Sequence, residues 1–206
     1  MRHLRSAHFQ ALHTPLTYQY LGVCGTEAGS LTPKISRRDI TRKTLELTNT
    51  KVKAVKSGLD ITKCRGYFLA MTNTEARLVQ QFGCNVIVIA RDLNYCWQRF
   101  VYTKELMHLF DIEDEQTTST ESFEKLLTEF GQPALERSPQ IESEVKALWM
   151  ALACFCPEKN RLEFKAQLDK GHIDNYSIAL QLRIPEQYIP ALFSPSYSDV
   201  IAQLIS

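Results

Sequence analysis

The residues best suited to chemistry stand in the segment 104–108, which reads KELMH. In zinc-dependent hydrolases the helical pattern H-E-x-x-H places two histidines one turn apart, so that both reach one metal ion. The glutamate between them polarises the metal-bound water. Here Glu105 and His108 keep the spacing, but Lys104 stands where the first histidine would be. A protonated ammonium has no lone pair for a metal, so the segment predicts the place of such a site with an altered ligand set.

A second predicted helix, at about 141–156, offers a further ligand. Its inward stripe is apolar apart from Glu144, which stands at its head, and Pro157 ends it. A carboxylate on an otherwise apolar face needs a partner. Glu144 therefore stands where a third metal ligand would be required.

Three segments together resemble the ImmA/IrrE family of zinc metallopeptidases. The family's active-site helix, R-F-x-x-A-H-E-x-x-H, is similar to residues 99–108 (RFVYTKELMH). Its second helix, E-x-x-A-N-x-F-A-x-x-L-L-x-P, is similar to residues 144–157 (EVKALWMALACFCP), and its C-terminal segment, I-A-x-x-[apolar]-x-V-[SP], to residues 178–185 (IALQLRIP). The resemblance is strongest over residues 64–193. It does not extend to residues 1–60, and it includes no helix-turn-helix of the kind that often accompanies this domain.

The resemblance implies that Glu105 is the catalytic general base and that His108 and Glu144 are zinc ligands. With a replacement for the missing ligand, the protein would be a zinc-dependent endopeptidase that cleaves a repressor or another regulatory protein. Without one, it would be a catalytically impaired or inactive member of the same fold, with no metal cofactor. Such a protein would bind a protein partner and act as a regulator in a prophage, mobile-element or stress-regulation setting. The lysine favours the second alternative.

Three interpretations of Lys104 are open. In the first, its ammonium replaces the charge of the metal and pairs with Glu105 or Glu144. In the second, Asp111, which lies three residues after His108, or Glu113 completes a shifted metal site. In the third, the match is accidental and the helix is simply charged.

The surrounding pattern predicts an α+β fold, with a small, mostly antiparallel sheet packed on a helical zincin-like core that carries the active-site helix and a C-terminal helical tail. We expect strands at 66–71 and 85–90, and a short strand or helical turn at 76–80. We expect one helix at about 36–56 and another that begins at about residue 94 and contains 104–108. Further helices are expected at 121–130, 141–156, 162–169, 176–182 and 185–192. Residues 1–60 are predicted to form a basic N-terminal extension, irregular over 1–35, and residues 61–206 the metallopeptidase-type domain.

Charge and composition limit the partners. The net charge is +1, but residues 1–56 carry ten Lys/Arg against three Asp/Glu. We therefore expect no nucleic-acid binding by the core domain, although the basic segment 34–56 could provide a nucleic-acid contact. No apolar run reaches the length of a membrane span. The six cysteines include no C-x-x-C pair, which is typical of buried thiols in a reducing compartment and favours the cytoplasm.

Overall fold

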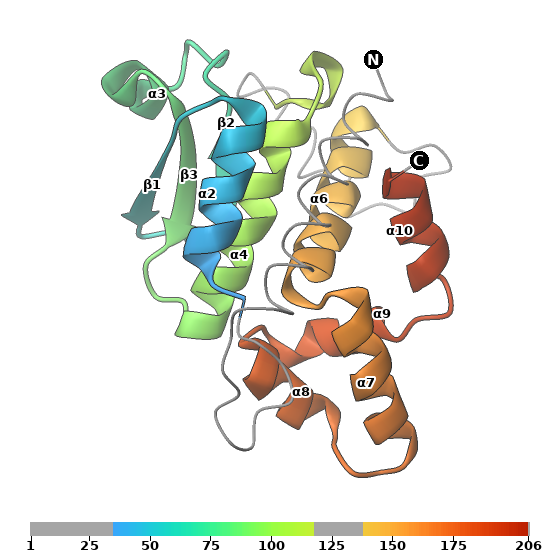
Figure 1. Cartoon of the computed structure of the whole chain (residues 1–206). Helices are drawn as coiled ribbons and strands as arrows, with labels where there is room; N and C mark the ends of the chain where they lie inside the picture. Colours follow the sequence, from blue (N-terminus) through green and yellow to red (C-terminus); the bar gives the residue numbers. More distant parts are fainter. Residues whose placement is uncertain (1–34, 118–137, 206) are drawn as a thin grey trace.

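The computed structural model describes residues 35–117 and 138–205 and has an α+β architecture (Figure 1). A three-stranded sheet has the strand order β1-β3-β2, formed by β1 (Val52–Ser57), β3 (Asn85–Ala90) and β2 (Gly66–Leu69). β1 pairs parallel to β3, whereas β2 pairs antiparallel to it. The sheet is thus mixed, and the expectation of a mostly antiparallel sheet was wrong because β1 was not predicted as a strand.

The predicted helix at 36–56 is correct only in its first part. Helix α2 (Arg37–Thr48) begins at Ser36, whose side chain accepts a hydrogen bond from the backbone N–H of Asp39. It ends at Asn49, which adopts a left-handed conformation with φ of 49°, a conformation that asparagine tolerates better than most residues. The chain then enters β1. The exposed lysines of this edge strand hide the alternation of apolar and polar residues by which a strand is recognised in a sequence.

The remaining elements largely follow the predicted pattern. The segment at 76–80 is helical, since it belongs to α3 (Arg77–Phe82). The predicted helix at 121–130 and residues 1–34 lie outside the described residues. The other elements are α4 (Tyr95–Met107), the 3-10 turns η1 (His108–Phe110) and η2 (Glu113–Glu115), α6 (Pro139–Phe155), α7 (Glu158–Asp169), α8 (Asn175–Leu182), η3 (Glu186–Tyr188), α9 (Ile189–Leu192) and α10 (Tyr197–Ile205). None of the described helices is long and apolar enough to cross a membrane.

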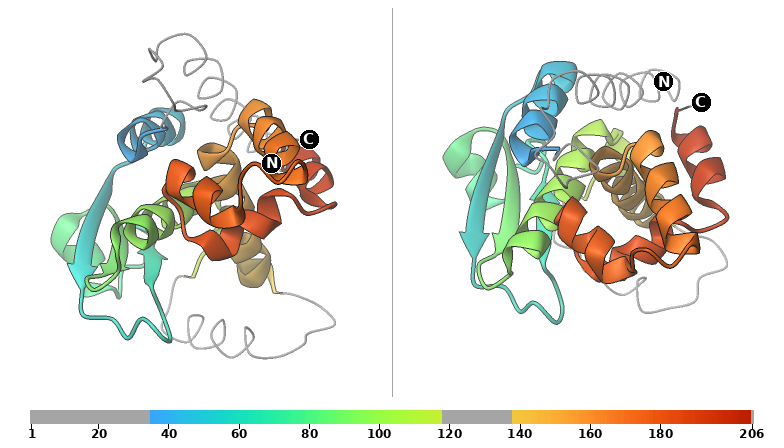
Figure 2. Two further views of the ribbon diagram at one scale, coloured as in Figure 1. Left: turned by 90° about the horizontal axis from the view of Figure 1, so that it is seen from below. Right: turned by 60° about the horizontal axis from the view of Figure 1, so that its bottom comes forward.

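Helix α4 is the central element of the fold. It contacts β2 and β3 on one side, α6 on another and α2 on a third (Figures 1 and 2). Ile40 of α2 and Phe100 of α4 share one core cluster with residues of α6 and α8. Because α2 and β1 belong to this sheet and core, the domain division predicted at residue 60 falls between two strands of one sheet.

Arg99 fixes the position of α4 in this core. Its buried guanidinium donates hydrogen bonds to the carbonyl oxygens of Ile35, Leu182 and Arg183. It also lies 4.3 Å from the centre of the Phe155 ring. Burial lowers the pKa of Arg99 to about 10, which still leaves the group cationic at neutral pH. One side chain therefore ties α4 to the segment before α2, to the end of α8 and to α6.

Gly66 allows β2 to approach α4 closely. A Cβ atom at this position would lie 2.5 Å from Cγ1 of Val101 and 2.8 Å from the carbonyl oxygen of Val88. We expect Gly66→Ala to lower the free energy of unfolding by about 1–3 kcal/mol, as overpacking does in other cores. Gly58→Ala is the matched control because a Cβ at Gly58 meets nothing within 4 Å. Urea unfolding measures both variants, and equal stabilities would contradict the close approach.

Candidate functional site

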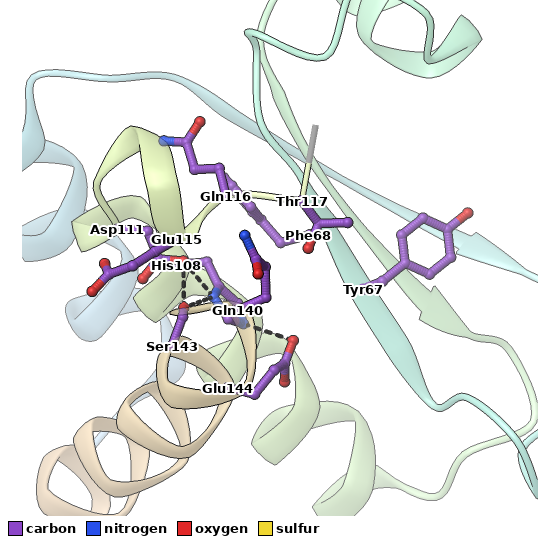
Figure 3. Close-up of a pocket in the computed structure, with 10 residues that line it drawn as sticks. All are labelled: Tyr67, Phe68, His108, Asp111, Glu115, Gln116, Thr117, Gln140, Ser143 and Glu144. Atoms are coloured by element: carbon purple, nitrogen blue, oxygen red, sulfur yellow. Dashed lines mark hydrogen bonds and ion pairs between the residues drawn. The ribbon is translucent and has the colours of Figure 1, made fainter. Parts of the chain in front are cut away.

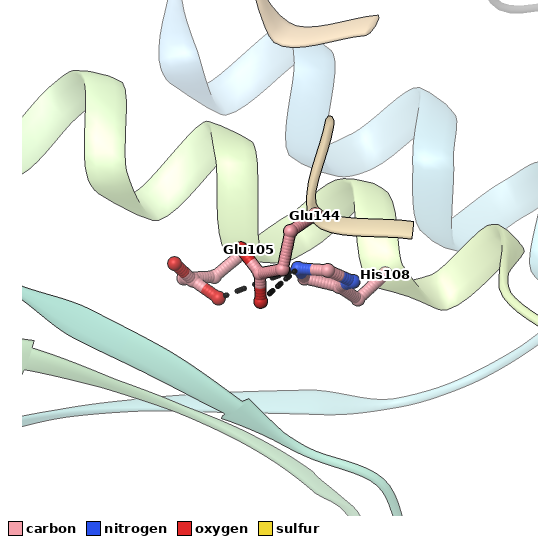
Figure 4. Close-up of side chains that lie close together, drawn as sticks. All are labelled: Glu105, His108 and Glu144. Carbon is pink, nitrogen blue, oxygen red and sulfur yellow. Dashed lines mark ion pairs between the residues drawn. The ribbon is translucent and has the colours of Figure 1, made fainter. Parts of the chain in front are cut away.

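The end of α4 and the first half of α6 bring three potential ligands together. The ligand atoms of Glu105, His108 and Glu144 all lie within 4.8 Å of one another (Figure 4). Glu105 and His108 are one helical turn apart, and Glu144 faces them from α6. The two helices thus assemble the residues that the sequence pattern predicted to share a site.

Lys104 lies between the two carboxylates of this cluster. Its Nζ is 3.0 Å from Oε1 of Glu105 and forms a second ion pair with Oε2 of Glu144. The Lys104 side chain is 19% exposed and that of Glu105 is 2% exposed. The pairing expected when the lysine replaces a metal charge is therefore confirmed, with both carboxylates as partners.

His108 connects the cluster to a second set of polar groups. Its Nε2 lies 3.4 Å from Oε1 of Glu144 and 3.7 Å from Oε2 of Glu105. Its Nδ1 lies 2.7 Å from Oδ2 of Asp111 and 3.1 Å from Oγ of Ser143. Phe68 of β2 stacks on the imidazole, with ring centres 6.0 Å apart. The ring is thus held on its face by Phe68 and at Nδ1 by hydrogen bonds, with two carboxylates near Nε2.

These contacts favour a protonated His108. Burial by itself would lower the pKa of the imidazole, but Glu144 and Asp111 outweigh it and raise the pKa to about 10. At neutral pH both ring nitrogens then carry a proton. An imidazolium has no lone pair for a metal ion, so metal binding would first require His108 to lose a proton.

The three other groups show how the cluster balances its charge. Burial opposes ionisation of Lys104 and Glu144. Attraction to Glu105 and Glu144 nevertheless raises the pKa of Lys104, and attraction to Lys104 and His108 holds the pKa of Glu144 below its usual range. Burial raises the pKa of Glu105, and Lys104 opposes that rise. Two basic side chains thus face two carboxyl groups in this cluster.

The donor set does not fit a catalytic zinc site. Such a site takes three protein ligands and leaves one position open for water. The protonated Lys104 has no lone pair for a metal ion. Its ammonium forms ion pairs with both carboxylates that would have to turn toward the metal. Nε2 of His108 is buried and has no partner with hydrogen-bond geometry in the part of the chain that the structure describes. That atom and the convergence of Glu105, His108 and Glu144 are the features of the described site that favour a ligand.

The structure does not place Asp111 where a replacement ligand would be needed. Asp111 bonds Nδ1 of His108, whereas Glu105 and Glu144 approach Nε2, on the other edge of the ring. Glu113, the other candidate, is exposed on η2. The role of Asp111 is to orient the imidazole, as carboxylates commonly do for histidines in metal sites.

Two further residues of α6 belong to the site and were not predicted. Ser143 donates a hydrogen bond to Oδ2 of Asp111 at 2.6 Å. Lys146 lies 3.7 Å from Oδ1 of Asp111 and 2.7 Å from Oε2 of Glu115. Ser143 and Lys146 are three residues apart, so the helical period that selected Glu144 could also have indicated a neighbouring polar face.

The His108, Asp111 and Ser143 group is not a serine-hydrolase triad. In such a triad the histidine bonds the acid through one ring nitrogen and the serine through the other. Here both Asp111 and Ser143 contact Nδ1. Ser143 is also only 1% exposed, which keeps a substrate away from its hydroxyl.

A small pocket opens beside His108 and Glu144 (Figure 3). Its volume is about 30 Å³, and its walls come from β2, from the segment after η1 and from the start of α6. Phe68 and Tyr67 supply aromatic surface, while Gln116 and Gln140 supply amides. The pocket gives the charged cluster a route to solvent next to the edge of the sheet.

No protein-family model, curated protein or solved structure matches this chain. The chemistry of the site is therefore the basis for assigning a function.

The ion pairs of Lys104 predict a large effect of its removal. Lys104→Met removes the ammonium that pairs with the buried Glu105 and the half-buried Glu144, and we expect the free energy of unfolding to fall by about 3 kcal/mol. Lys165→Met is the control, because Lys165 and its partner Asp169 are both about half exposed, and exposed pairs contribute less than about 1 kcal/mol. Denaturant unfolding at neutral pH measures both, and a Lys104→Met protein as stable as the control would contradict the pairing.

The raised pKa of His108 predicts a loss of stability at alkaline pH. The folded-state value is about 10, above the unfolded value of about 6.5. The contribution of His108 to the free energy of unfolding is thus complete below the pKa of the unfolded state. It disappears as the pH rises through the pKa of the folded state. We expect His108→Asn to remove this part of the pH dependence. Unfolding curves of both proteins across that interval measure the difference, and parallel pH profiles would refute a raised pKa.

Proposed function

We propose that this protein is a catalytically inactive regulator with a metallopeptidase-like, zincin-type core, which binds a protein partner beside the old active site. The observation that carries the proposal is the position of the Lys104 ammonium between Glu105 and Glu144. Lys104 and a protonated His108 together supply the two positive charges that a zinc ion would bring. The resemblance to ImmA/IrrE peptidases supports the same ancestry.

The geometry disfavours hydrolysis for three separate reasons. A general base must accept a proton from water, but Glu105 is 1% exposed and is paired with Lys104. A metallopeptidase polarises the substrate carbonyl with a metal that keeps an open position, and Lys104 has no such capacity. The raised pKa of His108 favours its protonated form, and carboxylates lie near both ring nitrogens.

The edge of the sheet suggests how a partner would bind. β2 pairs only with β3 among the described strands, so no described strand lies along its outer edge. An extended peptide can add to such an edge through main-chain hydrogen bonds, with its side chains in neighbouring pockets. The pocket next to Phe68 lies where such a side chain would project. We propose a regulatory protein, such as a repressor from a phage, mobile-element or stress-response system, as the partner.

The basic segment 34–56 remains a separate prediction as a nucleic-acid contact. In α2, Arg42 pairs with Asp39 at 3.6 Å and with Glu46 at 3.2 Å, and Lys43 lies 3.8 Å from Glu46. Part of the charge of this segment is thus balanced locally, which favours a protein partner over nucleic acid.

An active zinc endopeptidase is the second candidate function. It is favoured by the convergence of Glu105, His108 and Glu144 and by the unbonded Nε2 of His108. For this function Lys104 must leave the cluster and His108 must lose its proton. Cleavage of a regulatory protein would then use Glu105 as the base.

Metal content distinguishes the two functions. After incubation with zinc and desalting, we expect the wild-type protein to retain no zinc and Lys104→His to retain about one ion per chain, since the variant restores a third protein ligand. Elemental analysis gives the stoichiometry. About one zinc per wild-type chain would contradict the regulator and favour the peptidase.

A further inference from the structure

One wall of the pocket is a short segment that follows η1, residues 112–117, which we call the strap. It contains η2, and Glu115, Gln116 and Thr117 from it line the pocket (Figure 3). The pocket has a volume of about 30 Å³, which is enough for water. With the strap in this position, Gln116 and Thr117 line the same small pocket as Glu144.

The strap is attached to its surroundings by polar side-chain contacts. Oγ1 of Thr72, in the loop after β2, donates to Oε1 of Gln116 at 3.0 Å. Nε2 of Gln140 in α6 donates to the carbonyl oxygen of Asp114 at 2.8 Å. Nζ of Lys146 donates to Oε2 of Glu115 at 2.7 Å. These contacts join the strap to both sides of the pocket.

Little apolar surface holds the strap in place. None of the side chains in 112–117 is buried, and Ile112 belongs to neither core cluster. Among the described residues, the backbone–backbone hydrogen bonds of this segment run within it: the N–H of Glu115 donates to the carbonyl oxygen of Ile112, and the N–H of Gln116 to that of Glu113. Segments with few buried apolar contacts open at low free-energy cost. Gln116 and Thr117 can therefore move while Gln140 and Lys146 hold the first part of the strap on α6. Asp111 is its fixed end, because His108 and Ser143 both bond it.

We propose that the strap is a gate on the pocket, closed in this structure and fastened by the Thr72–Gln116 bond. Opening breaks the exposed bond to Thr72 and moves Gln116 and Thr117 off the pocket, while the Lys104–His108 cluster stays intact. The space beside Phe68 and Glu144 then becomes large enough for a side chain of the partner. As control of partner access, the gate depends on the function proposed above, but its opening can be measured without any partner.

Amide hydrogen exchange tests the gate in the full chain. Thr72→Val and Gln116→Ala each remove the fastening bond, and we expect exchange of the amides at 113–117 to rise roughly two- to ten-fold, the range expected for one exposed hydrogen bond. Thr74→Val is the matched control, since Thr74 is an exposed threonine in the same loop, whereas the side-chain hydrogen bond from this loop to the strap comes from Thr72. Amides of β3 should keep their wild-type rates in all three variants.

Access to the pocket is measured in the same variants by NMR with a neutral, soluble nitroxide. We expect faster relaxation of the His108 ring protons in Thr72→Val and Gln116→Ala than in the wild type or Thr74→Val. Unchanged exchange of the strap would overturn the gate, and so would faster exchange with no change at His108. Neither result depends on zinc, so failure of the gate is distinguishable from failure of the proposed function.

Discussion

A buried carboxylate needs a counter-charge or a proton, and the arrangement of α4 and α6 depends on how Glu105 and Glu144 obtain theirs. The Glu105 side chain is 2% exposed and that of Glu144 is 22% exposed. Lys104 serves both, and His108 adds a second cation at Nε2. Isolated buried charges are costly, whereas a complete set with good geometry is tolerated. The junction between the two helices is thus held by a charge balance that requires all four groups.

The rest of the molecule supports this junction from several sides. Arg99 ties α4 to α6 through Phe155. Its hydrogen bonds to the carbonyl oxygens of Leu182 and Ile35 tie α4 also to the end of α8 and to the segment before α2. Asp111 and Ser143 set the orientation of the His108 ring, and Phe68 covers its face. These supports resemble those of a metal site, in which outer groups orient the ligands. In our account, the supports were kept while a lysine took over the electrostatic role of the metal.

The sequence predicted the centre of the site better than its surroundings. Lys104, Glu105, His108 and Glu144 could be placed together because helical periodicity puts three of them on one stretch of α4 and marks Glu144 as the polar exception on α6. The role of Asp111 could not be predicted in this way. It depends on the change from α-helix to 3-10 turn at His108, which decides which ring nitrogen the carboxylate meets. β1 was missed because an edge strand with exposed lysines lacks a clear apolar alternation.

We propose that Lys104 occupies the position of a metal ion between Glu105 and Glu144. A crystal structure of the wild-type protein grown with zinc, with data collected at the zinc absorption edge, tests it most directly. We predict no anomalous peak among Glu105, His108 and Glu144, and Nζ of Lys104 in contact with both carboxylates. A zinc peak bonded to Nε2 of His108, with Lys104 turned away from the cluster, would contradict the account.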